Sequence, residues 1–163
     1  MQQTQKAFSA VPWVRQAVVQ RVWPNRIRVQ LEEHHVAAMW SPDESTARSG
    51  SSAIDQLVNT YGEIFDANLG DVEDQELITL RGPEGSAAQM LTMARTLAPV
   101  WNRLQATVDE LSLSGRGSWR VELNTGAVIE LGRGSPTEVL ARCEQFVATV
   151  GQFTAQYQRP VQY

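Results

Sequence analysis

Three short extended runs with glycine-containing gaps between them constrain the fold of this chain more than any other feature. The runs cover residues 107–113, 119–123 and 127–131. The gaps, residues 114–118 and 124–126, contain the glycines and small polar residues that tight turns need. The pattern therefore predicts an antiparallel meander. Because alternate residues of a strand share a face, Trp119, Val121 and Leu123 are expected to point towards the helices.

A helix is expected to begin at Ser135-Pro136-Thr137-Glu138. Serine suits the N-cap, proline suits the first helical position, and a glutamate three residues after the cap can reach back to it. Apolar residues then recur at steps of four and three, as one face of a helix requires: Val139, Cys143, Phe146, Val150, Phe153 and Tyr157.

A second helix is expected upstream, because Ser86 and Gln89 also have the spacing of a capping box. Its predicted apolar seam is Met90, Ala94, Leu97, Trp101 and Leu104. Pro99 interrupts this seam, and we expect it to kink the helix or to end it near Ala98.

The N-terminal part reads as a short helix followed by a hairpin. Residues 2–11 permit a helix that ends before Pro12. The runs 15–21 and 26–32 are extended, with a turn at Trp23-Pro24-Asn25. Residues 41–53 are small and polar, which predicts an exposed, mobile loop with a domain boundary just before it.

Short strands are expected on either side of a bend at Gly62, within residues 56–65, and again at residues 77–80. Together the elements predict an α+β fold, in which helices pack on a mostly antiparallel sheet. The net charge of −4 is spread along the chain, which argues against nucleic acid as a partner.

Few residues offer catalytic or metal-binding chemistry. Glu32-Glu33-His34-His35 contains metal-ligand residue types, but neighbours on a strand point to opposite faces, which disfavours a metal site. Cys143 falls within an apolar seam, where a thiol is buried and unreactive. We therefore expect no catalytic residues, no metal, no cofactor and no small-molecule substrate.

Arg116 is the clearest candidate for contact with another protein. It lies between two glycines at the expected tip of a hairpin, close to Trp119 in sequence. An exposed arginine beside an aromatic residue is a common anchor for a partner's carboxylate.

Several motifs in order resemble the FtsQ/DivIB family of cell-division proteins. Residues 11–40, VPWVRQAVVQRVWPNRIRVQLEEHHVAAMW, are similar to the end of that family's POTRA module. Further similarity runs through LVNTYGEIF, LRGPEGS, SLSGRGSWRVEL and the LGRG before the last helix. This chain departs from the family pattern at three positions, having Val36 where Pro is usual, Met39 where Arg is common and Cys143 where Phe is typical.

The resemblance implies a non-catalytic scaffold on the periplasmic face of the bacterial inner membrane. Such a protein recruits and links FtsB, FtsL and other divisome proteins, and its β-domain binds FtsB by adding it to a sheet edge. The implied partner-binding residues are Arg116, Trp119 and Tyr163.

The resemblance also implies a division of the chain into two parts. Residues 1–40 would be the C-terminal part of a POTRA domain, a helix-strand-strand remainder, and residues 41–163 a β-domain without its last strands. The membrane anchor of the parent protein would lie outside this chain. Because the missing last strands form most of the family's FtsB site, FtsB binding is expected to be weak or absent. The alternative is a POTRA-containing protein of outer-membrane assembly or secretion.

Overall fold

The computed structural model describes most of the chain, apart from residues 1–6, 8–9, 43–55, 68–71, 73–75 and 158–163. For residues 152–157 it describes the backbone alone. The strands are β1 (Val14–Val22), β2 (Arg26–Glu33), β3 (Val36–Pro42), β4 (Gln56–Asn59), β5 (Ile64–Asp66), β6 (Ile78–Gly82), β7 (Val108–Leu113), β8 (Ser118–Leu123) and β9 (Val128–Arg133). The helices are α2 (Ala87–Asn102) and α3 (Pro136–Tyr157).

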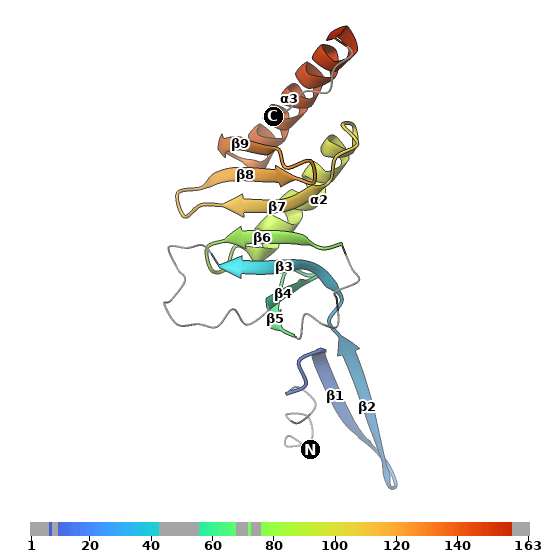
Figure 1. Ribbon diagram of the computed structural model, residues 1–163. Coiled ribbons are helices and arrows are strands. Elements are labelled where there is room, and N and C mark those ends of the chain that lie inside the picture. Colours follow the sequence, from blue (N-terminus) through green and yellow to red (C-terminus); the bar gives the residue numbers. More distant parts are fainter. Residues whose placement is uncertain (1–6, 8–9, 43–55, 68–71, 73–75, 158–163) are drawn as a thin grey trace.

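Within the described residues the strands form two sheets, shown in Figure 1. Strands β1 and β2 form an antiparallel hairpin, as the sequence predicts. The other seven strands form one sheet in the order β5-β4-β3-β6-β7-β8-β9. Its pairs are antiparallel except β3 with β6 and β6 with β7, which are parallel. The α+β fold class is therefore confirmed.

The core lies between one face of the seven-stranded sheet and the two helices. Helix α2 packs on β6 and β7, and α3 packs on β9 and on α2. Trp119, Val121 and Leu123 of β8 are buried on that face, which confirms the predicted inward set. From α2 and α3, Leu97, Trp101, Val139 and Cys143 meet the same cluster.

The predicted start of α3 is confirmed in detail. The backbone N–H of Ser135 donates to Glu138 Oε2 at 2.7 Å, and the backbone N–H of Glu138 lies 3.4 Å from Ser135 Oγ. This reciprocal pair is the capping box read from the sequence. The predicted bend at Gly62 is also present, with a left-handed φ of 84° between β4 and β5.

The capping box predicted at Ser86 is wrong. Ser86 has helical dihedral angles, φ −90° and ψ −4°, and its side chain makes no cap hydrogen bond. Its Oγ donates instead to the carbonyl oxygen of Pro83 at 2.7 Å. The helix nevertheless begins at the predicted place.

Of the two outcomes expected at Pro99, a kink or an end of the helix near Ala98, the end does not occur, because α2 continues through Pro99 to Asn102. Val100 and Trp101, which follow the proline, are 3% and 0% exposed. Burying large apolar side chains contributes about 1.5–3 kcal/mol each, enough to offset the roughly 3 kcal/mol that an interior proline costs.

Strand β3 was not foreseen, and it affects the proposed domain division. It begins at Val36 and pairs with β4 and β6 in the seven-stranded sheet. A boundary between residues 40 and 41 therefore cuts through this strand, whereas the two sheets separate at His34 and His35. Ser41 and Pro42 belong to β3, and the rest of the predicted loop lies outside the described residues, as does most of the predicted helix at 2–11.

Neither helix has a stretch in its described part that is both long and apolar enough to cross a lipid bilayer.

Candidate functional site

The tip of the β7–β8 hairpin presents Arg116 to solvent. The backbone N–H groups of Ser114 and Gly117 donate to Ser118 O at 2.9 Å and to Ser114 O at 2.8 Å. Gly117 has a left-handed φ of 81°, a conformation that costs glycine little. The turn is thus tightly bonded, and Arg116 is exposed and makes no ion pair within the described residues.

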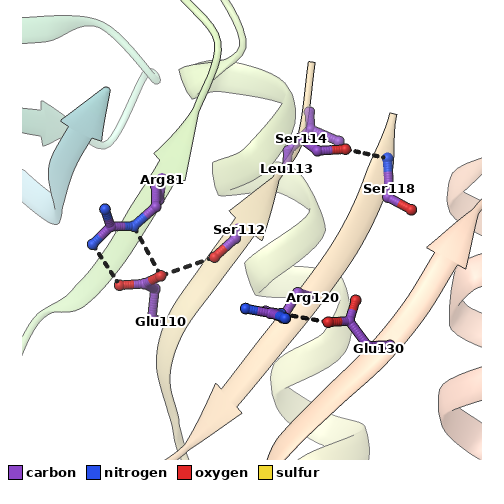
Figure 2. Close-up of a pocket in the computed structure, with 8 residues that line it drawn as sticks. All are labelled: Arg81, Glu110, Ser112, Leu113, Ser114, Ser118, Arg120 and Glu130. Atoms are coloured by element: carbon purple, nitrogen blue, oxygen red, sulfur yellow. Dashed lines mark hydrogen bonds and ion pairs between the residues drawn. The ribbon is translucent and has the colours of Figure 1, made fainter. Parts of the chain in front are cut away.

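A shallow trough of about 500 Å³ runs from this hairpin across the outer face of the sheet, opposite the helices (Figure 2). It crosses β6, β7, β8 and β9, because the residues that alternate with the buried ones point outwards on each strand. It is lined by Arg81, Glu110, Ser112, Leu113, Ser114, Ser118, Arg120 and Glu130.

Two ion pairs occupy the trough, and they differ in rigidity. Arg81 holds Glu110 through two hydrogen bonds, Nε to Oε1 at 3.0 Å and Nη2 to Oε2 at 3.2 Å. Ser112 Oγ donates to the same carboxylate at 2.9 Å. The pair of Arg120 and Glu130 is more exposed, with 57% and 60% of each side chain accessible. An exposed pair of this kind is worth little and exchanges its partners easily.

The ionisation of Glu110 reflects this environment. Burial is the largest influence and opposes the charged form. The hydrogen bonds from Arg81 and Ser112, with the positive charges of Arg81 and Arg120, outweigh it and hold the pKa of Glu110 below its usual value. Glu110 therefore stays ionised at neutral pH, and its charge is neutralised by Arg81.

Strand β9 forms one edge of the seven-stranded sheet in the described part of the chain. Val128 on this strand is 49% exposed. The pairing of Ser118 with Arg133 places the end of β9 beside the hairpin that carries Arg116. An edge that pairs with no other described strand and an exposed cation therefore lie at the same corner of the sheet.

The three residues predicted to bind a partner have different positions. Arg116 lies at the exposed tip, as expected. Trp119 is 2% exposed, so its ring belongs to the core and offers no surface to a partner. Tyr163 lies outside the described residues.

The trough residues Arg81, Glu110, Arg120 and Glu130 were not singled out from the sequence. Each occupies a polar position that alternates with a buried one along its strand. That alternation could have shown that each of the four side chains points away from the core. It could not have shown that they form a row, because this requires the order in which β6, β7, β8 and β9 lie side by side.

The residues considered for metal or nucleophilic chemistry have other roles. Glu32 accepts a hydrogen bond from Arg15, and His34 contacts Asn59. Among the residues that the structure describes, no group of three or more His, Cys, Asp or Glu converges. Burial raises the pKa of the Cys143 thiol to about 11, so its thiolate is scarce at neutral pH.

Comparison with known proteins points to one family. The family described as "Cell division protein FtsQ/DivIB, C-terminal" matches residues 48–163, and "POTRA domain, FtsQ-type" matches residues 1–34. The chain is 38% identical over 160 residues to the cell division protein FtsQ of Thiomonas arsenitoxydans, covering 98% of this chain and 56% of that protein.

Other relatives give the same picture. The FtsQ of Burkholderia pseudomallei is 37% identical over 158 residues, covering 96% of this chain and 58% of that protein. The FtsQ of Bordetella pertussis is 36% identical over 134 residues, covering 82% of this chain and 45% of that protein. The chain thus spans about half the length of the curated relatives it matches.

Proposed function

This chain belongs to the FtsQ/DivIB family of cell-division proteins, and on that premise we propose that it is a non-catalytic scaffold that binds other division proteins. Its proposed partners are FtsB and FtsL, which it links to other divisome proteins on the periplasmic face of the inner membrane. The observation that supports this best is the corner where the edge of β9 meets the exposed Arg116.

A sheet edge suits the capture of an extended partner segment. Main-chain N–H and C=O groups along the edge give affinity, and neighbouring side chains select the sequence that binds. Among the described strands, the edge strand nearest Arg116 is β9, which pairs with β8 on its other side.

Arg116 is the best-placed residue to supply selectivity. Its guanidinium is exposed and not committed to an ion pair within the described residues, so a partner's carboxylate meets no competitor. Arg81, by contrast, already holds Glu110 with two hydrogen bonds. A charge-assisted bond from Arg116 to an acidic residue of FtsB is therefore the proposed anchor.

We also propose that the chain has two parts, a POTRA-type portion containing the β1–β2 hairpin and a β-domain containing the seven-stranded sheet. The match to the POTRA family ends at residue 34, and β3 begins at Val36. This supports a boundary near His34 and His35 in place of one after residue 40. The FtsQ-type match favours a division protein over the alternative of outer-membrane assembly or secretion.

The experiment uses the chain extended past Tyr163 to the length of its relatives. Its binding to the periplasmic part of FtsB is measured by calorimetry, with Arg116→Glu as the test. We expect roughly tenfold weaker binding or more, since reversing a charge both removes an attraction and adds a repulsion.

A matched control separates local contact from overall charge. Arg28→Glu changes the net charge equally, at an exposed position of the β1–β2 hairpin. It should leave the affinity for FtsB nearly unchanged. Equal affinities for the two variants would remove Arg116 from the site, and no binding by the unchanged extended chain would reject FtsB as a partner.

A further inference from the structure

A polar cluster joins the β1–β2 hairpin to the seven-stranded sheet, and the proposed function does not use it. We call Arg15, Glu32, His34, Asn59 and Glu63 the junction cluster. Arg15 donates to Glu32 Oε1 at 2.8 Å and to both carboxylate oxygens of Glu63 at 2.7 and 3.2 Å. Its guanidinium also lies 4.0 Å from the centre of the Tyr61 ring.

Asn59 has a fixed orientation at the centre of this cluster. Its Oδ1 accepts hydrogen bonds from the backbone N–H groups of Tyr61 and Glu63, each at 2.9 Å. Its Nδ2 consequently faces Glu63 Oε2 at 2.6 Å and His34 Nδ1 at 2.9 Å. Turning the amide over would place its N–H groups against two backbone donors, and Asn59 is fully buried, so no water can replace the lost bonds.

The orientation of Asn59 determines the tautomer of His34. Because Asn59 Nδ2 can only donate, His34 Nδ1 has to accept, and the proton of the neutral ring is on Nε2. The ring is held in place by stacking on Phe65, with centroids 4.1 Å apart and planes 4° apart. The backbone N–H of His34 donates to Trp13 O at 2.8 Å.

We propose that the junction cluster is a proton-sensitive latch between the hairpin and the seven-stranded sheet. A proton taken from solvent onto His34 Nδ1 would place two donors face to face, so the hydrogen bond from Asn59 breaks. The hairpin then loses one of the contacts that hold it against β4. The inference does not depend on the proposed division partners.

Some of the groups around His34 raise its pKa and others lower it. Burial is the largest influence on its pKa and lowers it, as does the positive charge of Arg15 on β1. The carboxylates of Glu63, between β4 and β5, and Glu32, on β2, raise it, but the net pKa lies below the ordinary value. Tyr61 also faces the cluster, with its hydroxyl 3.4 Å from Glu32 Oε1.

The sign of the effect follows from proton linkage. A histidine whose pKa is lower in the folded state binds protons more tightly when unfolded, so acid favours unfolding or opening. The contribution of His34 is complete above a pH of about 6.5, the value for free histidine, and declines as the pH falls towards its folded pKa. The carboxylate of Glu63 acts in a separate, more acidic range, since its hydrogen bonds from Arg15 and Asn59 lower its pKa to about 2.

The test is an NMR titration of the 163-residue chain between about pH 7.5 and 5. The ring signals of His34 should titrate below a pH of about 6.5, and the backbone amides of Tyr61 and Glu63 should shift with the same midpoint. His34 titrating at or above that value, or amides that stay still while it titrates, would overturn the proposal.

A pair of variants supplies the second measurement. His34→Gln keeps an acceptor for Asn59 but has no titrating ring, so the decline in unfolding temperature between about pH 6.5 and 5 should be lost. His35→Gln, at the exposed neighbouring position, should retain it. An unchanged pH response in the His34 variant would refute the latch. If that variant does not fold, the titration of the unchanged chain decides alone.

Discussion

Replacing Gly62 with alanine tests how closely the β4–β5 corner packs on helix α2. Gly62 has a left-handed φ of 84°. A Cβ added there would lie 2.5 Å from Ala88 Cα and 2.6 Å from Ala88 Cβ, much closer than carbon atoms approach without repulsion. Neither the corner nor the helix backbone can give way as a flexible side chain would, so the variant carries both a backbone and a steric penalty.

A second glycine separates the two penalties. Gly126, in the β8–β9 turn, has a similar φ of 79°, but a Cβ there would meet nothing within 4 Å. Alanine in a left-handed conformation costs about 1–2 kcal/mol. Alanine also lowers the conformational entropy of the unfolded chain, which stabilises the folded state by about 0.4–1 kcal/mol. Gly126→Ala should therefore destabilise the fold by about 1 kcal/mol. Overpacking adds about 1–3 kcal/mol, so Gly62→Ala should destabilise by about 2–4 kcal/mol.

Urea unfolding followed by tryptophan fluorescence measures both variants against the unchanged chain. The midpoint should fall about two to four times further for Gly62→Ala than for Gly126→Ala, with similar slopes. Equal destabilisation of the two would show that the corner does not press against α2, and that only the backbone conformation matters.

Other predictions concern the core, the caps and the titrating groups. Trp119→Ala should lose about 3–5 kcal/mol of stability in urea unfolding because the ring is buried; an unchanged midpoint would place the ring at the surface. Ser135→Ala should lose about 1 kcal/mol and Ser135→Gly only a few tenths, and an unchanged stability of Ser135→Ala would deny the side chain a capping role. Glu63→Gln should remove the part of acid unfolding that lies between about pH 4.5 and 2, since the lowered pKa of Glu63 stabilises the fold above that range. Cys143 should resist a thiol reagent at pH 8 until urea unfolds the chain, and rapid labelling of the folded chain would contradict its burial.

Local patterns in the sequence were sufficient for the hairpins and helices. The β1–β2 hairpin and the β7–β8–β9 meander were predicted because neighbouring strands pair through short turns, so their pairing is encoded within a few residues. The cap at Ser135 and Glu138 is local in the same sense. Arg116 was found for this reason also, as its position at a turn fixes its exposure.

The features that were not predicted depend on contacts between residues that are distant in sequence. Val36 to Trp40 show little alternation of polar and apolar residues, because both faces of β3 are covered: Ala38 and Trp40 lie in the main core, and Val36 and Met39 pack against a second apolar cluster. Asn59 and His34 meet only because β4 packs beside the junction, and no spacing rule announces such a contact. The row of charges in the trough likewise needs the parallel pairing of β6 with β7. At Ser86 the pattern was present, but the backbone conformation turned its hydroxyl to Pro83.

The parallel centre of the large sheet has a consequence for how the chain folds. Strand β6 joins β3 on one side to β7 on the other, and both pairings close long stretches of chain, from Ala38 to Ile78 and from Leu80 to Leu111. The β4–β5 pair on one side and the β7–β8–β9 meander on the other can form early, since they close only short loops. Closing these two long stretches costs chain entropy before the contacts of β6 with β3 and β7 can stabilise the fold. We therefore expect the docking of β6 to limit the folding rate.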